Sequence, residues 1–266
     1  MLSGFKILKA DSLHLWILGW TVKKTTNGGK SWFQDNVYIG NKYTYASDMF
    51  TFDSNNVYVA ADSGFFKSTN GGANWDKISD EIMRSFWFIN KKEIWGGGKN
   101  ILVPSLVHST DSGITWNDLI ERNYPYSSED YIKVEFINHD TGWICTQNPN
   151  SSNSYVVKSI DGGKTWNSQN IKTDQSALDM IMLNENSGFL IGENGMIYKT
   201  TDGGQNWISK SSGTSYRLTN ISFTNKDYGW IVGYSIGDTT SIILKTTDSG
   251  DSWTTQYLNI ANVYLK

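Results

Sequence analysis

Short stretches of alternating apolar and polar residues, separated by turn residues, recur along the whole chain. The C-terminal part shows this most clearly: residues 218–224 alternate, a turn follows at 225–227, and 229–233 form an apolar stretch around Trp230. A third stretch covers 241–246 and a fourth covers 252–257. Strands this short, at regular spacing and with turn signals between them, predict an all-β fold.

One pattern, which we call the box, returns six times and divides the chain into repeats of four strands. It reads Ser/Thr, any residue, Asp/Asn, any residue, Gly, any residue, Ser/Thr/Asn, Trp, and its Asp or Asn positions lie 41 to 50 residues apart. The copies are Lys24–Trp32, Lys67–Trp75, His108–Trp116, Lys158–Trp166, Lys199–Trp207 and Lys245–Trp253. A period in this range indicates a repeat architecture.

The residue types of the box predict a closed turn between the third and fourth strands of each repeat. Asp or Asn at a turn corner accepts hydrogen bonds from the following amides, and the Gly two residues later permits a positive φ. The tryptophan can then cover the turn, so that its burial stabilises the repeat. The structural residues are therefore Asn27, Trp32, Asn70, Trp75, Asp111, Trp116, Asp161, Trp166, Asp202, Trp207, Asp248 and Trp253.

Calcium binding is the functional alternative for the box, but no copy offers more than two carboxylates, whereas a calcium loop supplies several oxygen ligands. We therefore expect no metal site there.

A second repeated feature is an aromatic residue near the start of every second strand: Trp16, Tyr58, Trp95, Trp143, Phe189 and Trp230. Because a single repeat cannot bury both its faces, the repeats are expected to pack as blades of a ring. We predict a β-propeller of six four-stranded antiparallel blades, with seven as the alternative, in one domain over residues 1–266. Residues 262–266 look like the start of another first strand, so the sequence could be part of a longer chain.

The boxes and the second-strand aromatics resemble the Asp-box, or bacterial neuraminidase repeat, family of β-propellers. The stretches Gly188–Gly204 and Gly229–Trp253 are most similar to the photosystem II stability and assembly factor-like repeats. Asn27 and Asn70 replace the usual Asp, and Ser112 and Ser249 replace the first Gly, but each change keeps the turn chemistry. The resemblance implies a propeller; its functions range over assembly factors, secreted bacterial proteins and glycosidases.

Composition narrows the classes of partner. The 266 residues carry a net charge of −3 with no long run of either sign, so a nucleic-acid partner is not indicated. No apolar stretch is long enough to insert into a membrane. Cys145 is the single cysteine, and His14, His108 and His139 lack zinc-ligand spacing, so we expect no metal and no cofactor. We expect an extracellular or periplasmic location after loss of a signal peptide, with the cytoplasm as the alternative; the oligomeric state stays open.

Long connections fall on the side of the blades opposite the boxes, which we call the loop side. We expect long loops at 98–106, 147–155 and 235–240 between second and third strands, and at 34–47 and 117–131 between blades. Aromatic and arginine residues, which anchor recognition surfaces, gather there. The predicted binding residues are Trp20, Arg84, Arg122, Tyr124, Tyr126, Tyr216 and Arg217; alternatively the tyrosines only cover blade edges.

Catalysis is poorly supported by the sequence. Sialidases of this fold use an arginine triad, and the nearest match to their first arginine motif is Phe5-Lys6-Ile7-Leu8, where Lys cannot replace a bidentate guanidinium. A carboxylate pair for another glycoside hydrolase stays open among Glu121, Glu129, Asp130, Asp174 and Asp238. Glu135, in mid-strand, is expected to be a satisfied buried carboxylate. We therefore expect a non-catalytic binding or assembly scaffold for a protein or glycan; the alternatives are a glycoside hydrolase and a carbohydrate-binding lectin.

Overall fold

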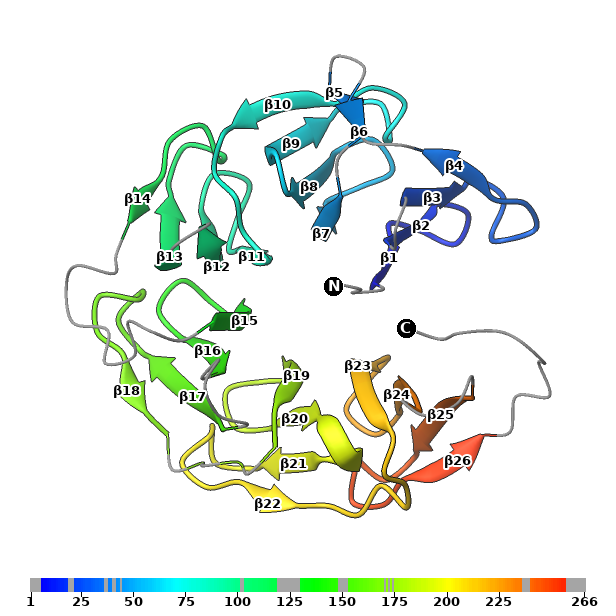
Figure 1. Ribbon diagram of the computed structural model, residues 1–266, viewed down its shortest axis with the longest axis vertical. Helices are drawn as coiled ribbons and strands as arrows, with labels where there is room; N and C mark the ends of the chain where they lie inside the picture. The colour runs from blue at the N-terminus through cyan, green and yellow to red at the C-terminus, as the bar shows by residue number, and fades with distance from the viewer. Residues whose placement is uncertain are drawn as a thin grey trace. The chain divides into compact units, whose positions relative to one another are not determined.

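The computed structural model describes residues 6–18, 22–35, 38–39, 42–43, 45–100, 103–118, 130–147, 153–169, 171, 173, 175–235 and 240–256. They form two compact units, Met1–Ser127 and Ser128–Lys266, and each unit contains three four-stranded antiparallel sheets (Figure 1). We call these sheets blades 1 to 6 in chain order. The predicted all-β propeller of six four-stranded blades is confirmed.

The first unit holds blades 1 to 3. Their strands are β1 (Lys6–Lys9), β2 (Leu15–Leu18), β3 (Val22–Thr25) and β4 (Phe33–Asp35) in blade 1; β7 (Ala46–Thr51), β8 (Val57–Ala61), β9 (Gly64–Ser68) and β10 (Asp76–Ser79) in blade 2; and β11 (Ser85–Phe88), β12 (Ile94–Asn100), β13 (Val103–Ser109) and β14 (Asn117–Asp118) in blade 3. The connection after blade 1 carries a small hairpin of β5 (Tyr38–Ile39) and β6 (Lys42–Tyr43).

The second unit holds blades 4 to 6. Their strands are β15 (Asp130–Phe136), β16 (Gly142–Gln147), β17 (Ser154–Ser159) and β18 (Asn167–Ser168) in blade 4; β19 (Ala177–Met182), β20 (Gly188–Gly192), β21 (Ile197–Thr200) and β22 (Ile208–Ser209) in blade 5; and β23 (Arg217–Phe223), β24 (Gly229–Tyr234), β25 (Ser241–Thr246) and β26 (Thr254–Gln256) in blade 6. A 3₁₀ turn, η2 (Glu193–Gly195), joins β20 to β21.

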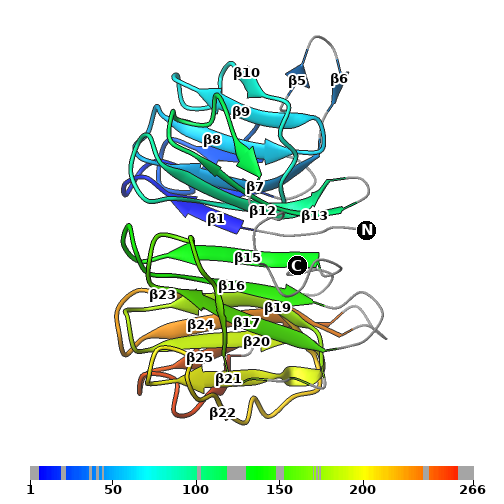
Figure 2. The ribbon, with the colours of Figure 1, turned by 90° about the vertical axis from the view of Figure 1, so that its left-hand side faces the viewer.

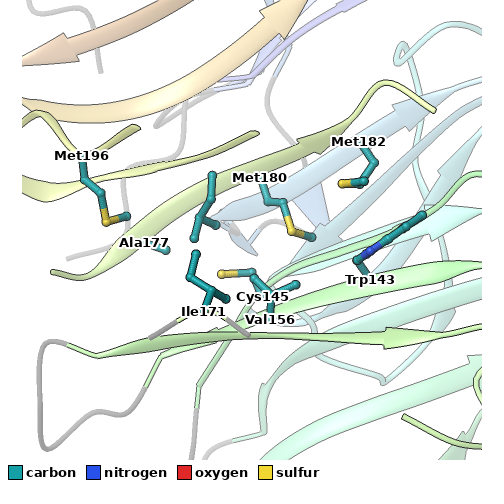
Figure 3. Close-up of a cluster of buried hydrophobic side chains, with 9 residues drawn as sticks. Trp143, Cys145, Val156, Ile171, Ala177, Met180, Met182 and Met196 are labelled. Atoms are coloured by element: carbon teal, nitrogen blue, oxygen red, sulfur yellow. The ribbon is translucent and has the colours of Figure 1, made fainter. Parts of the chain in front are cut away.

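The hydrophobic core lies between neighbouring blades, because alternate residues of each strand point to opposite faces of its sheet. Blades 1 and 2 bury Trp16 and Leu18 against Met49, Val59 and Phe66. In the second unit, the sheets lie one above another (Figure 2), and blade 4 contributes Trp143, Cys145 and Val156 to a cluster completed by methionines of blade 5 (Figure 3). The expectation that a blade buries its faces only against its neighbours is therefore met within each unit.

The expected loop at 98–106 is wrong. Strands β12 and β13 pair continuously as far as Asn100 and Val103, so most of this stretch is an extended hairpin. Gly96 and Gly97, which precede this stretch, are residues of β12. A side chain at Gly98 would come within 2.7 Å of the Arg84 backbone nitrogen, which explains why glycine stands there.

The fourth strands are the shortest of each blade. Three of them, β14, β18 and β22, have two residues each, and the residues of all three are exposed. The single-domain prediction for residues 1–266 stays a prediction.

Candidate functional site

A buried hydroxyl organises each of the six boxes. The Ser or Thr two residues before the corner donates to the Oδ1 of the corner Asp or Asn at 2.8–2.9 Å. The same hydroxyl accepts the amide of the second glycine at 2.7–2.9 Å. The six hydroxyl residues, at most 1% exposed, are Thr25, Ser68, Ser109, Ser159, Thr200 and Thr246. The predicted turn chemistry is thus present in every copy.

Two successive residues after each corner adopt positive φ. The predicted glycine, two places after the corner, has φ between 74° and 94° in all the boxes. The residue before it also lies in the left-handed region, where Ser112 (φ 68°) and Ser249 (φ 59°) stand in place of glycine. Their hydroxyls donate to the Lys91 carbonyl and to the Asp227 carboxylate, and these bonds offset the cost of the conformation.

The box carboxylates are held in their ionised form by these bonds. Hydrogen bonds from Thr115 and Ser252 lower the pKa of Asp111 and of Asp248 to about 2. The pKa of Asp161 is lowered mainly by the Thr165 hydroxyl, and that of Asp202 mainly by the Asn206 amide. A group whose oxygens are already bonded within its own turn is poorly placed to bind a ligand.

A second turn lies between the first and second strands of each blade, and the sequence predicted it only in blade 6, at 225–227. Its corner Asp or Asn accepts the amides two and three residues later at 2.7–3.1 Å. The corners are Asp11, Asp53, Asn90, Asn138, Asn184 and Asn225. Each lies five residues before the second-strand aromatic, a spacing from which the turn could have been found.

The two turns of a blade dock on each other. The amide of the first Gly or Ser of each box donates to a carbonyl of the first turn at 2.7–3.1 Å, as Gly203 does to Asn186. Every blade has one Asp and one Asn at its two corners: blades 1 and 2 carry the Asp in the first turn, and blades 3 to 6 carry it in the box. Each docked pair therefore has one charged and one neutral corner.

A basic residue at the start of each box lies beside the second-strand aromatic of its own blade. It pairs across the sheet with the second-strand aromatic; the Lys158 ammonium, for example, lies 4.8 Å from the centre of the Trp143 ring. The Trp143 indole in turn donates to the Gly203 carbonyl in the box of blade 5 at 2.9 Å. Burial lowers the pKa of Lys158, although Glu185 and Asp202 oppose this. These contacts join neighbouring blades.

The box tryptophans are covered to different degrees. Trp253 is 9% exposed and meets the rings of Phe189 and Phe223 edge to face, whereas Trp32 is 38% exposed. The other four are half-buried, and the Trp116 indole donates to the Gly113 carbonyl. Burial of the tryptophan, expected for every box, is thus wrong for Trp32 and incomplete for the half-buried four.

The predicted binding residues are only partly within the described structure. Trp20, Arg122, Tyr124 and Tyr126 lie outside the described residues. Arg84 precedes β11, and its backbone amide donates to the Gly97 carbonyl at 2.9 Å. Tyr216 and Arg217 lie together at the loop side of the second unit, where β23 begins.

Three connections of blades 4 to 6 meet around Tyr216, and we call their residues the loop-end cluster: Gln175, Glu193, Asn194, Tyr216, Arg217 and Thr240. The Tyr216 hydroxyl lies 2.7 Å from that of Thr240, and Arg217 Nε forms an ion pair with Glu193 Oε1 at 3.2 Å. Asn194 donates to Gln175 at 2.6 Å. The Gly195 amide donates to the Tyr216 carbonyl at 2.7 Å, so the 3₁₀ turn is pinned to β23.

Most described carboxylates on the first strands bond the next blade. Glu135, 4% exposed, accepts the Met182 amide at 3.0 Å, which confirms the expected satisfied carboxylate. Asp48 and Asp179 do the same for Phe86 and Ile221, and they also pair with Lys6 and Lys133. These acids hold neighbouring blades together.

Glu81 differs from those acids, because burial and the nearby Asp118 carboxylate raise its pKa. It lies on the loop side, in the connection before β11. Of the acids named from the sequence, Glu121, Glu129, Asp174 and Asp238 fall outside the described residues.

The three histidines each contact a carboxylate: His14 meets Asp11, His108 meets Glu93 and His139 meets Asp140. Within the described ranges no group of three or more His, Cys, Asp or Glu residues is placed to hold a metal ion. No helix in that same part of the chain is long and apolar enough to cross a membrane.

Residues 158–261, which include the last three boxes, match the family model described as Photosynthesis system II assembly factor YCF48. Comparison with curated proteins finds no significant match.

Solved structures share the fold. YCF48 bound to D1 peptide matches with a TM-score of 0.70 and 17% identity, covering 95% of this chain and 81% of that one. YCF48 from Cyanidioschyzon merolae gives 0.70 and 14%, covering 96% and 85%. The GH74 xyloglucanase from Xanthomonas campestris gives 0.74 and 12%, covering 96% of this chain but 45% of the enzyme. The chain is thus similar in fold both to an assembly factor and to part of a glycoside hydrolase.

Proposed function

We propose that this Asp-box β-propeller, whose last three repeats are of the YCF48 type, is a non-catalytic scaffold that binds a segment of a protein partner on its loop side. The chain shares its fold, at 17% identity, with a YCF48 structure that has a bound D1 peptide, and this shared fold supports the proposed peptide-binding role. Residues of the second unit support the loop side as the binding side.

The loop-end cluster is the observation that carries this proposal. In the turns on the box side, the polar groups form hydrogen bonds with one another. The buried Ser and Thr hydroxyls of the boxes therefore have no free acceptor. At the loop end, Tyr216, Asn194 and Thr240 combine an aromatic ring with amide and hydroxyl groups that already hold hydrogen bonds to neighbouring side chains. Side chains held in this way lose little conformational entropy on docking, which favours recognition there.

The backbone of this region is closely packed, which supports the view that it is preformed. Gly195 has φ 71°, and a side chain on it would come within 2.0 Å of the Thr214 carbonyl oxygen. The position therefore requires glycine, and the 3₁₀ turn presents Asn194 in one fixed orientation.

The test is a titration of the protein with a D1 peptide of the kind bound in the YCF48 structure, together with a screen of a peptide array and a glycan array. Tyr216→Ala with Asn194→Ala, and separately the triple change of Arg122, Tyr124 and Tyr126 to Ala, should each weaken binding by about 2 kcal/mol or more. The matched control is Lys30→Ala with Lys164→Ala, two exposed box-side residues. If only the control pair loses binding, the ligand binds on the box side and the proposal is wrong. If the protein binds glycans alone, the lectin is favoured.

Lys67, Lys158 and Lys199 are unsuitable controls because they contact second-strand aromatics. Their replacement would disturb blade packing as well as charge.

A glycoside hydrolase is the second candidate, and Glu81 is the observation that favours it. A carboxyl with a raised pKa beside a second carboxylate is the arrangement of a general acid and its partner. Our proposal expects no hydrolysis of xyloglucan, β-glucan or sialosides above background. Hydrolysis that disappears in Glu81→Gln and in Asp118→Asn would replace the scaffold by an enzyme.

An extracellular or periplasmic location is part of the proposal. Fractionation of the source cells, followed by detection of the chain, tests it directly; recovery in the cytoplasm alone would contradict it.

A further inference from the structure

The lysines at the start of the boxes differ in what holds their ammonium groups. Lys158 of blade 4 lies 4.8 Å from the centre of the Trp143 ring, whereas the other box lysines lie 5.4–5.9 Å from their rings. Lys199, at the same position of blade 5, also pairs with the Asp251 carboxylate at 3.0 Å. Within the part of the chain that the structure describes, no carboxylate forms an ion pair with Lys158. These two lysines of the second unit therefore differ in one partner.

One residue of the following box accounts for this difference. Asp251, the partner of Lys199, stands two positions before the box tryptophan of blade 6. The residue at the same position of the blade 5 box is Gln205, whose side chain is exposed. Lys158 thus precedes a box with a neutral amide where Lys199 precedes one with a carboxylate.

The two boxes lie alike on the preceding blade, which justifies the comparison. A side chain at Gly250 in the blade 6 box would come within 2.3 Å of the Phe189 ring, which pairs with Lys199. One at Gly204 in the blade 5 box would come within 3.3 Å of the Trp143 indole nitrogen. In both cases the second glycine of the box covers the aromatic ring that the lysine contacts.

The ammonium of Lys158 is packed against backbone as well as against the ring. A side chain at Gly203 would come within 2.6 Å of Lys158 Nζ, so glycine leaves the room that the ammonium occupies. Burial lowers the pKa of Lys158, and the Glu185 and Asp202 carboxylates oppose that change. At neutral pH, Lys158 is therefore present as the neutral amine more often than an ordinary exposed lysine. A neutral lysine amine attacks carbonyl compounds.

The surroundings of Lys158 favour a product that keeps the positive charge. The Trp143 ring attracts a cation, and the Glu185 and Asp202 carboxylates stabilise one. Acylation would remove the charge by forming an amide, whereas a protonated Schiff base retains it. The same carboxylates repel an anionic reagent. The reagent that fits this site is therefore a neutral aldehyde.

We propose that Lys158 is a site at which small neutral aldehydes bind covalently as a Schiff base. The Lys158 nitrogen attacks the aldehyde carbon, and a C=N bond replaces the C=O bond. The aldehyde oxygen takes two hydrogens from the nitrogen and leaves as water, while the nitrogen keeps one hydrogen and the positive charge. No oxidant or reductant takes part. The site lies on the box side and does not rest on the loop-side ligand.

Reductive trapping in the full-length protein tests this site. The protein is incubated with propanal and cyanoborohydride at neutral pH, and peptide mass mapping gives the labelling rate of each lysine. Lys158 should be labelled about fivefold faster than Lys199, or more. It should also be labelled faster than the exposed Lys164. The lead over Lys164 should disappear above pH 10.4, about the ordinary pKa of lysine.

Exchange of the partner residue gives the matched variants. Gln205→Asp supplies Lys158 with the carboxylate that Lys199 has, so it should lower the labelling of Lys158 to the rate of Lys199. The control Gln205→Asn keeps this exposed position neutral and should leave the rate unchanged. Asp251→Gln should raise the labelling of Lys199 about fivefold. The Gln205 variants decide the matter if Asp251→Gln fails to fold, since Lys210 also bonds Asp251.

Two results would overturn the site: equal labelling of Lys158 and Lys199 in the parent, or labelling of Lys158 that Gln205→Asp does not slow. The class of ligand is tested with acetyl phosphate, an anionic acyl donor. Its preference for Lys158 over Lys199 should be smaller than that of propanal. An equal or larger preference would show a reactive amine without selection for a Schiff base, which would overturn the assignment to aldehydes.

Discussion

Blades 1 and 6 are built from the same four strands and the same box, yet they differ in charge and in packing. Blade 6 places its corner aspartate, Asp248, in the box, while blade 1 has Asn27 there and Asp11 in the first turn. Trp253 of blade 6 is 9% exposed and packs edge to face against two stacked phenylalanine rings, and Trp32 of blade 1 is 38% exposed. The hydrogen bonds inside the two boxes nevertheless have nearly the same lengths.

The comparison shows that the box depends on geometry before charge. Asn27 Oδ1 accepts the Thr25 hydroxyl and the Ser31 amide at 2.9 Å, as Asp248 does from Thr246 and Ser252 at 2.8 and 3.0 Å. What the carboxylate adds is a second acceptor oxygen, which takes the Ser252 hydroxyl at 2.6 Å. Charge should therefore affect the pH dependence of stability more than the shape of the turn.

Removal of the tryptophan should separate the two blades most strongly. Trp253→Ala should lower the free energy of unfolding by about 3–5 kcal/mol, because it leaves a cavity beside the stacked rings of Phe189 and Phe223. Trp32→Ala should cost about 1 kcal/mol, since much of that ring is already in water. Urea unfolding of the two variants measures the difference. Equal losses would mean that exposure does not decide what the box tryptophan contributes.

Removal of the buried hydroxyl should affect the two blades equally. Thr246→Ala and Thr25→Ala each leave a corner oxygen and a glycine amide without their shared partner, at a cost of about 1–3 kcal/mol. The denaturant midpoints of the two variants should agree within error. A clearly larger loss in blade 6 would show that the carboxylate contributes to the geometry after all.

Acid should act on blade 6 through its box and on blade 1 through its first turn. The pKa of Asp248 is lowered to about 2, so its stabilisation is complete above the pKa of an unfolded aspartate, near 4, and disappears as the pH falls through 2. Asp248→Asn should be less stable than the parent at pH 7, and the difference should shrink between pH 4 and pH 2. Urea midpoints across that range provide the measurement.

Asp11→Asn is the matching change in blade 1, because amides of Leu13 and His14 lower the pKa of Asp11. The difference in stability between Asp11→Asn and the parent should likewise shrink as the pH falls. A difference that stays constant with pH in either variant would contradict the assignment of the acid response to that corner.

The smallest effect is expected from the placement of the single charge in each pair of corners. Asn27→Asp should give a loss below about 1 kcal/mol at low salt, because it adds a second carboxylate beside Asp11, and salt should reduce that loss. The exchange Asp11→Asn with Asn27→Asp should restore the stability of the parent. If Asn27→Asp, which has two aspartates, is as stable at low salt as the exchange, the pairing of one Asp with one Asn has no electrostatic cause.

The repeated elements could be predicted because each is encoded within a few residues. The box turn, its left-handed glycine and the second-strand aromatic all follow from local spacing, and each is present six times. The first turn was predicted only in blade 6, although Asn184 and its equivalents keep a constant distance to the next aromatic. A single Asn or Asp before a strand is too common a signal to be noticed without the aromatic as a reference.

The loop side could not be predicted from the same rules. The bond that pins the 3₁₀ turn joins Gly195 to Tyr216, and the Tyr216 hydroxyl contacts Thr240, 24 positions further along the chain. Both contacts form only through tertiary packing. The hairpin that replaced the expected loop at 98–106 follows from strand pairing across glycines, which carry no apolar alternation. Predictions for Trp20, Arg122, Tyr124 and Tyr126 remain predictions.

The brevity of the fourth strands bears on how the protein behaves when it is concentrated. An exposed sheet edge can template further strands from neighbouring molecules, and a long, flat edge is an aggregation hazard. Strands β18 and β22 end after two residues, so each offers too few consecutive amides and carbonyls to add a strand in register. A protein composed almost wholly of β-strands can therefore expose several sheet edges and still resist the addition of strands from neighbouring molecules.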